Sequence, residues 1–227
     1  MANEAAREMV ETFPPGAASL VTASELDRSF KASVRFGDFS SATLTIDGVE
    51  TSPRQVEGVV STIAYFLPQE FYYVEPADRE YVRSETTAFF IYFLSQLACP
   101  KLNPPTAKTL CGLGMHRIEW MRGARNAGVP LQRVRTHDGQ TTYDDVPDAR
   151  QRVRATCIGD AIVEDRVPDA VRAHLLALSE AFRMPYLCAD FIAPGDGDYR
   201  LADLWSVPDV RVPANRAAIV RFMRGRP

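Results

Sequence analysis

The sequence lacks both a strong excess of charge and a long hydrophobic run. Its 227 residues carry a formal net charge of -3, with 24% charged residues. Binding to nucleic acid or to anionic lipid usually needs a basic excess, so neither partner is expected. The longest apolar stretch, residues 88–99, contains Ser95 and Gln96 and is shorter than the roughly 20 residues of a membrane-spanning helix. It predicts a buried helix, and no membrane association is expected.

Paired cysteines and familiar nucleotide motifs are also absent. The four cysteines stand at wide spacings, with no Cys-x-x-Cys pair, so neither a zinc site nor a disulfide framework is predicted. The first residues lack the features of a signal peptide, and a cytoplasmic location is expected. The sequence has no P-loop, dinucleotide glycine signature or hydrolase elbow. Cys111, beside Gly112 and Gly114, is a candidate nucleophile, although an inert buried thiol is the favoured interpretation.

What remains is the composition of a globular α/β protein, with 46% hydrophobic residues. Residues 1–16, which end at Pro14-Pro15-Gly16, predict a flexible N-terminus. Residues 17–135 predict a domain with a sheet and helices. Its expected elements are strands at 17–22, 42–46 (with a hairpin turn at Asp47-Gly48), 58–63 and 99–103, and helices at 78–97 and 116–127.

The C-terminal part follows a polar segment without helical periodicity, residues 136–152, which predicts a linker. Residues 153–227 then predict a second lobe. Its expected elements are strands at 153–158 and 161–164, a helix that starts at Pro168, a hairpin formed by 186–193 and 199–204, and a last helix at 214–223.

The hairpin is the most informative feature. A Gly-Asp-Gly-Asp turn separates its two apolar runs, so Asp190 and Asp203 can lie side by side on neighbouring strands. Two adjacent ionised carboxylates repel each other, and a divalent cation such as magnesium or an arginine would neutralise them. The alternative to a metal site is that both aspartates cap strand ends or form salt bridges with Arg154 and Arg200.

Three motifs resemble the ATP-grasp superfamily of carboxylate-amine ligases. Cys99-Pro-Lys-Leu-Asn-Pro-Pro105, followed by a helix and Ala127-Gly-Val-Pro-Leu131, resembles the entry into the ATP-binding part of those enzymes. Arg152-Val-Arg-Ala-Thr-Cys-Ile-Gly-Asp160 resembles their core strand pair. The segments around Asp190 and Leu201-Ala-Asp-Leu-Trp-Ser-Val-Pro208 resemble their two metal-binding strands.

The resemblance implies a pre-ATP-grasp-like α/β domain followed by an ATP-grasp-like α+β lobe. It also implies magnesium and ATP as cofactors, with Asp190 and Asp203 as metal ligands. Arg154 takes the position of an arginine that faces the phosphates, which makes it the candidate catalytic residue. The parent activity is formation of an acyl phosphate, followed by formation of an amide bond.

The chain departs from the family in ways that predict a truncated lobe. In the family a subdomain with two lysines precedes the core strands, whereas here residues 131–151 contain no lysine, and all three lysines of the chain precede residue 109. Trp205 replaces the family's metal-binding asparagine and offers no oxygen to a cation. Its ring either stacks on a cofactor or ligand, or fills the space of the missing subdomain.

Two hypotheses follow. A degenerate, non-catalytic member would bind a ligand or act as a partner subunit. A ligase with an incomplete ATP site would need another subunit to complete it. Both predict association, either as a homo-oligomer or as a hetero-complex, because loss of the subdomain would expose apolar surface.

Overall fold

The computed structural model describes residues 2–22, 30–35, 38–46, 48–137, 140–143, 152–193 and 198–225. The chain forms two compact units. Unit 1 combines Met1–Cys111 with Asp209–Pro227, and unit 2 is Gly112–Pro208. Both units contain helices and antiparallel sheet, which confirms the predicted α/β class.

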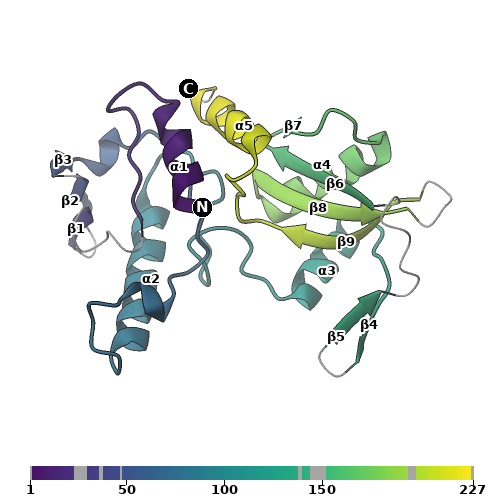
Figure 1. Cartoon of the computed structure of the whole chain (residues 1–227), viewed down its shortest axis with the longest axis horizontal. Helices are drawn as coiled ribbons and strands as arrows, with labels where there is room; N and C mark the ends of the chain where they lie inside the picture. The colour runs from purple at the N-terminus through teal and green to yellow at the C-terminus, as the bar shows by residue number, and fades with distance from the viewer. Residues whose placement is uncertain are drawn as a thin grey trace. The chain divides into compact units, whose positions relative to one another are not determined.

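The described residues of unit 1 form a three-stranded antiparallel sheet and three α-helices (Figure 1). The sheet order is β1-β2-β3, and the predicted hairpin between β2 and β3 is confirmed by the pairing of Ile46 with Val49. The elements are α1 (Ala2–Glu11), β1 (Phe30–Arg35), β2 (Asp38–Ile46), β3 (Val49–Thr51), the short 3-10 helices η2 (Pro53–Gln55) and η3 (Pro68–Glu70), α2 (Arg79–Gln96) and α5 (Pro213–Arg224).

The helix α2 is the centre of unit 1, as its apolar sequence predicts. Phe93 packs with Leu44 of the sheet and with Leu97, while Phe90 packs with Phe66 and Phe71 on another side. Helix α2 is therefore covered from more than one direction, which explains why its later turns lack a polar face. No helix in the described part of the chain is long and apolar enough to cross a membrane.

Residues 2–11, part of the segment for which a flexible N-terminus is expected, form the helix α1. Ala5, Ala6 and Met9 are buried on one side of it. Glu8 forms a 2.7 Å ion pair with Arg216 of α5, and the Arg224 guanidinium lies 5.2 Å from the Phe13 ring. Contacts with the far end of the chain thus add to the helix propensity of a segment that is rich in alanine and glutamate.

The predicted strands at 17–22, 58–63 and 99–103 are wrong. Residues 17–22 form no strand, and the other two segments meet only in a single parallel bridge between Val59 and Lys101. Val59 donates to the carbonyl of Pro100 and accepts from the N–H of Leu102, both at 3.0 Å. Pro100 has no N–H, and the prolines after Asn103 end any ladder that could grow from this bridge.

Unit 2 has a four-stranded antiparallel sheet in the order β7-β6-β8-β9. A parallel bridge between Leu131 and Leu201 adds a short segment beside β9. The elements are α3 (Arg117–Asn126), β4 (Val134–His137), β5 (Gln140–Tyr143), β6 (Arg152–Ile158), β7 (Ala161–Ile162), α4 (Asp169–Phe182), β8 (Tyr186–Ile192) and β9 (Arg200–Trp205). The predicted helices and the predicted β8–β9 hairpin are confirmed.

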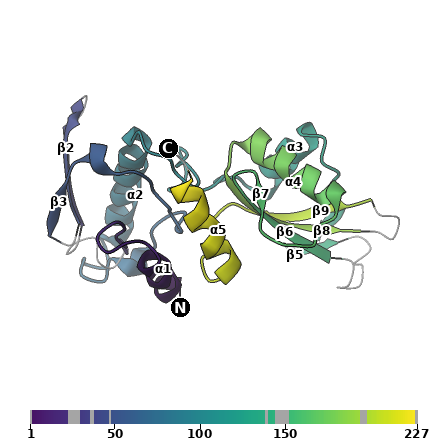
Figure 2. The same cartoon turned by 90° about the horizontal axis from the view of Figure 1, so that it is seen from above.

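One face of this sheet packs against the helices of unit 2, and the other carries charged side chains together with the buried Tyr186, Ile158 and Ile192. Both helices of the unit lie on one side of the sheet (Figure 2), where β6 and β8 contribute fully buried apolar side chains. This core includes Ala155, Cys157, Leu187, Ala189 and Phe191 of the sheet, and Val171, Leu175 and Leu178 of α4. Alternation along each strand sends the even-numbered residues of β6 and β8 to the opposite face.

A β-bulge at Ala202 sets which side chains of β9 join that opposite face. Asp190 pairs with Asp203, but Phe191 pairs with Leu201, so Ala202 is an extra residue in β9. Without it, Leu201 and Asp203 would lie on the same face, because they are two residues apart. The bulge lets Leu201 enter the core while Asp203 faces the other way.

The predicted linker 136–152 contains regular structure. Strands β4 and β5 pair as a hairpin, with Val134 opposite Tyr143, while residues 144–151 lie outside the described residues. This segment falls within unit 2. The division of the chain into domains at 1–16, 17–135, 136–152 and 153–227 stays a prediction.

The core of unit 2 supplies a test of this packing. Leu178 of α4 is fully buried, so Leu178→Ala should lower the free energy of unfolding by about 2–5 kcal/mol through lost contacts and a cavity. Ile118 of α3 is 73% exposed, and Ile118→Ala should change it by less than about 0.5 kcal/mol. Urea unfolding followed by tryptophan fluorescence measures both. Equal effects of the two substitutions would contradict the burial pattern.

Candidate functional site

Three charged side chains form a row across the polar face of the unit 2 sheet. Arg154 of β6 is the register partner of Asp190 of β8, and Asp190 is the partner of Asp203 of β9. The sequence-based expectation that the two aspartates are neighbours is therefore correct. The same register places Arg154 beside them.

Arg154 and Asp190 form a bidentate ion pair. The Arg154 Nε donates to Asp190 Oδ1 at 2.7 Å, and its Nη2 donates to Oδ2 at 3.0 Å. Arg152, two residues earlier on the same strand, adds a longer 3.4 Å contact to Oδ2. Asp190 is only 2% exposed, so its charge is removed from water and depends on these guanidinium groups.

Trp205 completes the surroundings of Arg154. Its ring centroid lies 4.9 Å from the Arg154 guanidinium carbon, a cation–π contact. The hydrogen bonds to Asp190 raise the pKa of Arg154 above its ordinary value, which keeps the side chain charged. Arg154 nevertheless stays 60% exposed, so its outer side is open to solvent or to an anionic ligand.

Asp203 lies beside this pair, and among the described residues its carboxylate forms no hydrogen bond with either member. Its Oδ1 accepts a hydrogen bond at 2.9 Å from the backbone N–H of Leu204, the next residue. Arg200, which the sequence offered as another partner for the aspartates, instead lies 3.7 Å from Asp198. Of the two arginines considered from the sequence, only Arg154 pairs with the row.

The arrangement fits an ion pair better than a divalent cation. Magnesium needs carboxylate oxygens with free lone pairs in an octahedral arrangement. Here both oxygens of Asp190 accept from arginine, and one oxygen of Asp203 accepts from the backbone. No group of three or more His, Cys, Asp or Glu side chains could hold a metal ion within the described ranges. The metal role of Asp190 and Asp203 stays a prediction, and no reaction step is derived from it.

Arg152 and Glu164 are polar residues of this face that the sequence-based site did not include. Glu164 accepts from the N–H of Thr156 at 2.7 Å and from its hydroxyl at 2.9 Å. The alternation of Arg152 and Arg154 along one strand was a signal for two cations on the same face. Nothing in the sequence indicated that Glu164 would fold back onto Thr156.

Cys111 is not arranged as a nucleophile. Its side chain is 1% exposed, and burial raises the pKa of its thiol to about 12. A thiol with that pKa is almost entirely protonated near neutral pH. The inert interpretation therefore holds for Cys111.

The Arg154–Asp190 pair can be tested by a double-mutant cycle. Arg154→Ala leaves the buried Asp190 carboxylate with one long contact and should cost about 1–3 kcal/mol of folding free energy. Adding Asp190→Asn removes the stranded charge and should recover part of that loss. Urea unfolding gives the coupling energy.

Arg152→Ala is the matched control, since Arg152 sits on the same strand and, among the described residues, makes only the 3.4 Å contact. It should cost less than about 1 kcal/mol. Additive effects of Arg154→Ala and Asp190→Asn would show that the pair contributes nothing to stability.

Comparison with known proteins identifies the architecture. The sequence matches no family model, and no curated protein matches it. Among solved structures, the macrocyclase MdnC from Microcystis aeruginosa MRC, bound with the precursor peptide MdnA, has a TM-score of 0.74 at 13% identity. That match covers 99% of this chain and 96% of MdnC.

Two further structures agree. A RiPP-associated ATP-grasp ligase from Chryseobacterium gregarium, in complex with ADP and a leader and core peptide, has a TM-score of 0.65 at 11% identity and covers 100% of this chain and 94% of its own. The ATP-grasp ligase PsnB, complexed with the precursor peptide PsnA2 and AMPPNP, has a TM-score of 0.66 at 13% identity and covers 97% and 93%. The chain therefore has an ATP-grasp-like α/β fold over nearly its whole length.

Proposed function

We propose that this protein is a degenerate, truncated ATP-grasp-like protein that binds a peptide as a partner subunit in a peptide-modification system. By itself it does not turn over ATP. The observation that carries this proposal is the bidentate pair between Arg154 and the buried Asp190. It fills the place where an ATP-grasp ligase is expected to hold a metal ion.

The electrostatics of the row support this reading. A cation next to Asp190 would have to displace a guanidinium that has two short hydrogen bonds and a ring against its other side. If a metal ion replaced the guanidinium, Asp190 would still be neutralised by a positive group, but Arg154 would lose its partner. The exchange would therefore bring little electrostatic gain. Trp205, on the strand that carries Asp203, adds no oxygen ligand.

The residues between α3 and β6 give independent support. Residues 127–151 contain no lysine, and the chain has no lysine after Lys108. In the family that the sequence resembles, two lysines in this interval grip the nucleotide. Without them, Arg154 is a cation near the expected phosphate position, and Asp190 already engages it.

The peptide as ligand is inferred from the proteins of similar fold. MdnC, PsnB and the Chryseobacterium gregarium ligase are described in complexes with precursor peptides. A fold that presents a peptide to a catalytic partner can keep the binding role after the ATP site is lost. We place the protein in the cytoplasm, associated with a second copy or with another subunit.

The second candidate is a magnesium- and ATP-dependent carboxylate-amine ligase whose ATP site is completed by another subunit. The adjacency of Asp190 and Asp203 favours it, because two neighbouring carboxylates are what a phosphate-bridging metal needs. In that state Arg154 would turn from Asp190 toward the phosphates and stabilise developing negative charge. PsnB has been described with magnesium and ADP.

Nucleotide binding separates the two candidates. We expect millimolar Mg-ATP to leave the melting temperature of the isolated protein unchanged, because ligand binding stabilises only through occupancy of a folded site. Differential scanning fluorimetry with Asp203→Asn and the exposed control Asp198→Asn measures this. Stabilisation that is lost in Asp203→Asn and kept in Asp198→Asn would favour the ligase.

Peptide binding is a separate prediction. A random peptide library displayed on phage and selected on the immobilised full chain should enrich a defined sequence class. Synthetic copies of the enriched peptides should bind with saturation in fluorescence anisotropy. A library that yields no enriched class after selection would contradict the peptide-binding function.

A further inference from the structure

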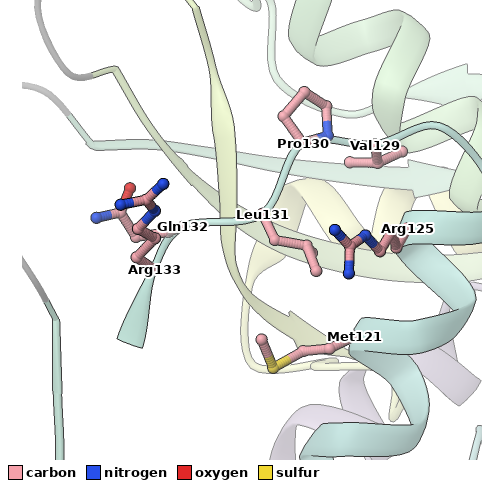
Figure 3. Close-up of a pocket in the computed structure, with 7 residues that line it drawn as sticks. All are labelled: Met121, Arg125, Val129, Pro130, Leu131, Gln132 and Arg133. Atoms are coloured by element: carbon pink, nitrogen blue, oxygen red, sulfur yellow. The ribbon is translucent and has the colours of Figure 1, made fainter. Parts of the chain in front are cut away.

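A pocket of about 590 Å³ lies in unit 2 between α3 and the segment that follows it (Figure 3). Met121 and Arg125 come from α3, and Leu131 points toward them from the opposite side. Val129 lines it between these elements, and Arg133 lies at the far end in the view of Figure 3. None of these residues belongs to the Arg154–Asp190 row.

Three of the residues that line the pocket, Met121, Val129 and Leu131, belong to the hydrophobic core or pack against it. Val129 is 2% exposed and belongs to the core, while Met121 and Leu131 pack against the core and are only partly buried. Apolar side chains that are half-covered at a concave site gain from burial by a ligand, at roughly 25 cal/mol per Å². The pocket therefore favours an apolar group.

The backbone beside the pocket is a sheet edge. Gln132 donates to the carbonyl of Leu201 at 2.9 Å, and Leu201 donates to the carbonyl of Pro130 at 2.8 Å. In this parallel pairing the N–H and C=O of Leu131 point away from β9. An extended peptide that runs along this edge can bond to Leu131 and place one side chain in the pocket.

The charge around the pocket selects the sign of the ligand. Two of the seven residues that line the pocket are arginines, Arg125 and Arg133, and none of the seven is acidic. Glu119 of α3 accepts from the N–H of His116 at 2.8 Å and does not line the pocket. Arg125 and Arg133 are exposed, and neither guanidinium has an ion-pair partner among the residues that the structure describes.

We propose that this pocket binds an acidic peptide segment, with one apolar side chain on Met121 and Leu131 and flanking carboxylates on Arg125 and Arg133. Each of these arginines suits a carboxylate, because a guanidinium can donate two parallel hydrogen bonds. The inference rests on the proposed peptide-binding function and adds the place and the chemical class of the peptide. The lining has no aromatic side chain on which a base could stack, so a single-stranded nucleic acid fits less well.

The test uses fluorescein-labelled hexapeptides and the full chain. EELLEE should bind with saturation, whereas EESSEE, which lacks the apolar pair, and SSLLSS, which lacks the carboxylates, should bind about tenfold more weakly or not at all. Arg125→Gln combined with Arg133→Gln should weaken EELLEE by about tenfold in anisotropy titrations. Both residues are exposed, so folding should be unaffected, and circular dichroism checks this.

Arg122→Gln is the matched control, because Arg122 is an exposed arginine of the same helix that does not line the pocket. It should change the affinity for EELLEE by less than about twofold. An equal loss in Arg122→Gln, equal binding of EESSEE, or displacement of EELLEE by a thymidine dodecanucleotide would each overturn the inference. So would the absence of saturable binding of EELLEE.

The outcome also distinguishes this inference from the proposed function. Peptides selected from the library that bind the Arg125→Gln, Arg133→Gln protein as tightly as the wild type would place peptide binding elsewhere. The proposed function would then stand and the pocket assignment would fall. If the library yields no binding peptide, both fall.

Discussion

The ion pair between Arg154 and Asp190 is the constraint on which the polar face of unit 2 depends. A carboxylate that is 2% exposed is costly unless it is paired, and Arg154 supplies two hydrogen bonds to it. The pair fixes where the guanidinium lies, and Trp205 then packs on its other side. The chemistry of this face is thus decided by how one buried charge is neutralised.

Much of unit 2 could be predicted from the sequence because its signals are local. Gly128 has a positive φ of 76° after α3, as a helix stop requires, and Pro168 stands directly before α4. The turn between β8 and β9 indicated that Asp190 and Asp203 would be neighbours, and the register confirms it. Such features need no knowledge of distant parts of the chain.

Other features could not be predicted because they depend on distant partners. The ion pair between Glu8 of α1 and Arg216 of α5 joins residues more than 200 positions apart along the chain. The segment at Val59 has the composition of a strand but finds only one bridge partner. At the site, the sequence offered either a metal or an arginine for Asp190, and only the register of β6 on β8 shows that Arg154 reaches it. The pocket at Leu131 lies between α3 and the segment that follows it, and no sequence motif indicated that their side chains would line a pocket.

Because of the bulge at Ala202, the position of Asp203 in the site depends on the number of residues in β9. The bulge changes which side chains of β9 face the core. If Ala202 were paired in regular register instead, the residues before it and those after it would no longer alternate as they do now between the two faces of the sheet. Leu201 and Asp203 would then face the same side of the sheet. Either the Asp203 carboxylate would be buried in the hydrophobic core, or the Leu201 side chain would be exposed to solvent. An added or lost residue elsewhere in the hairpin turn carries no such penalty. A comparison of homologous strands should therefore find that insertions avoid β9, whatever residues occupy it.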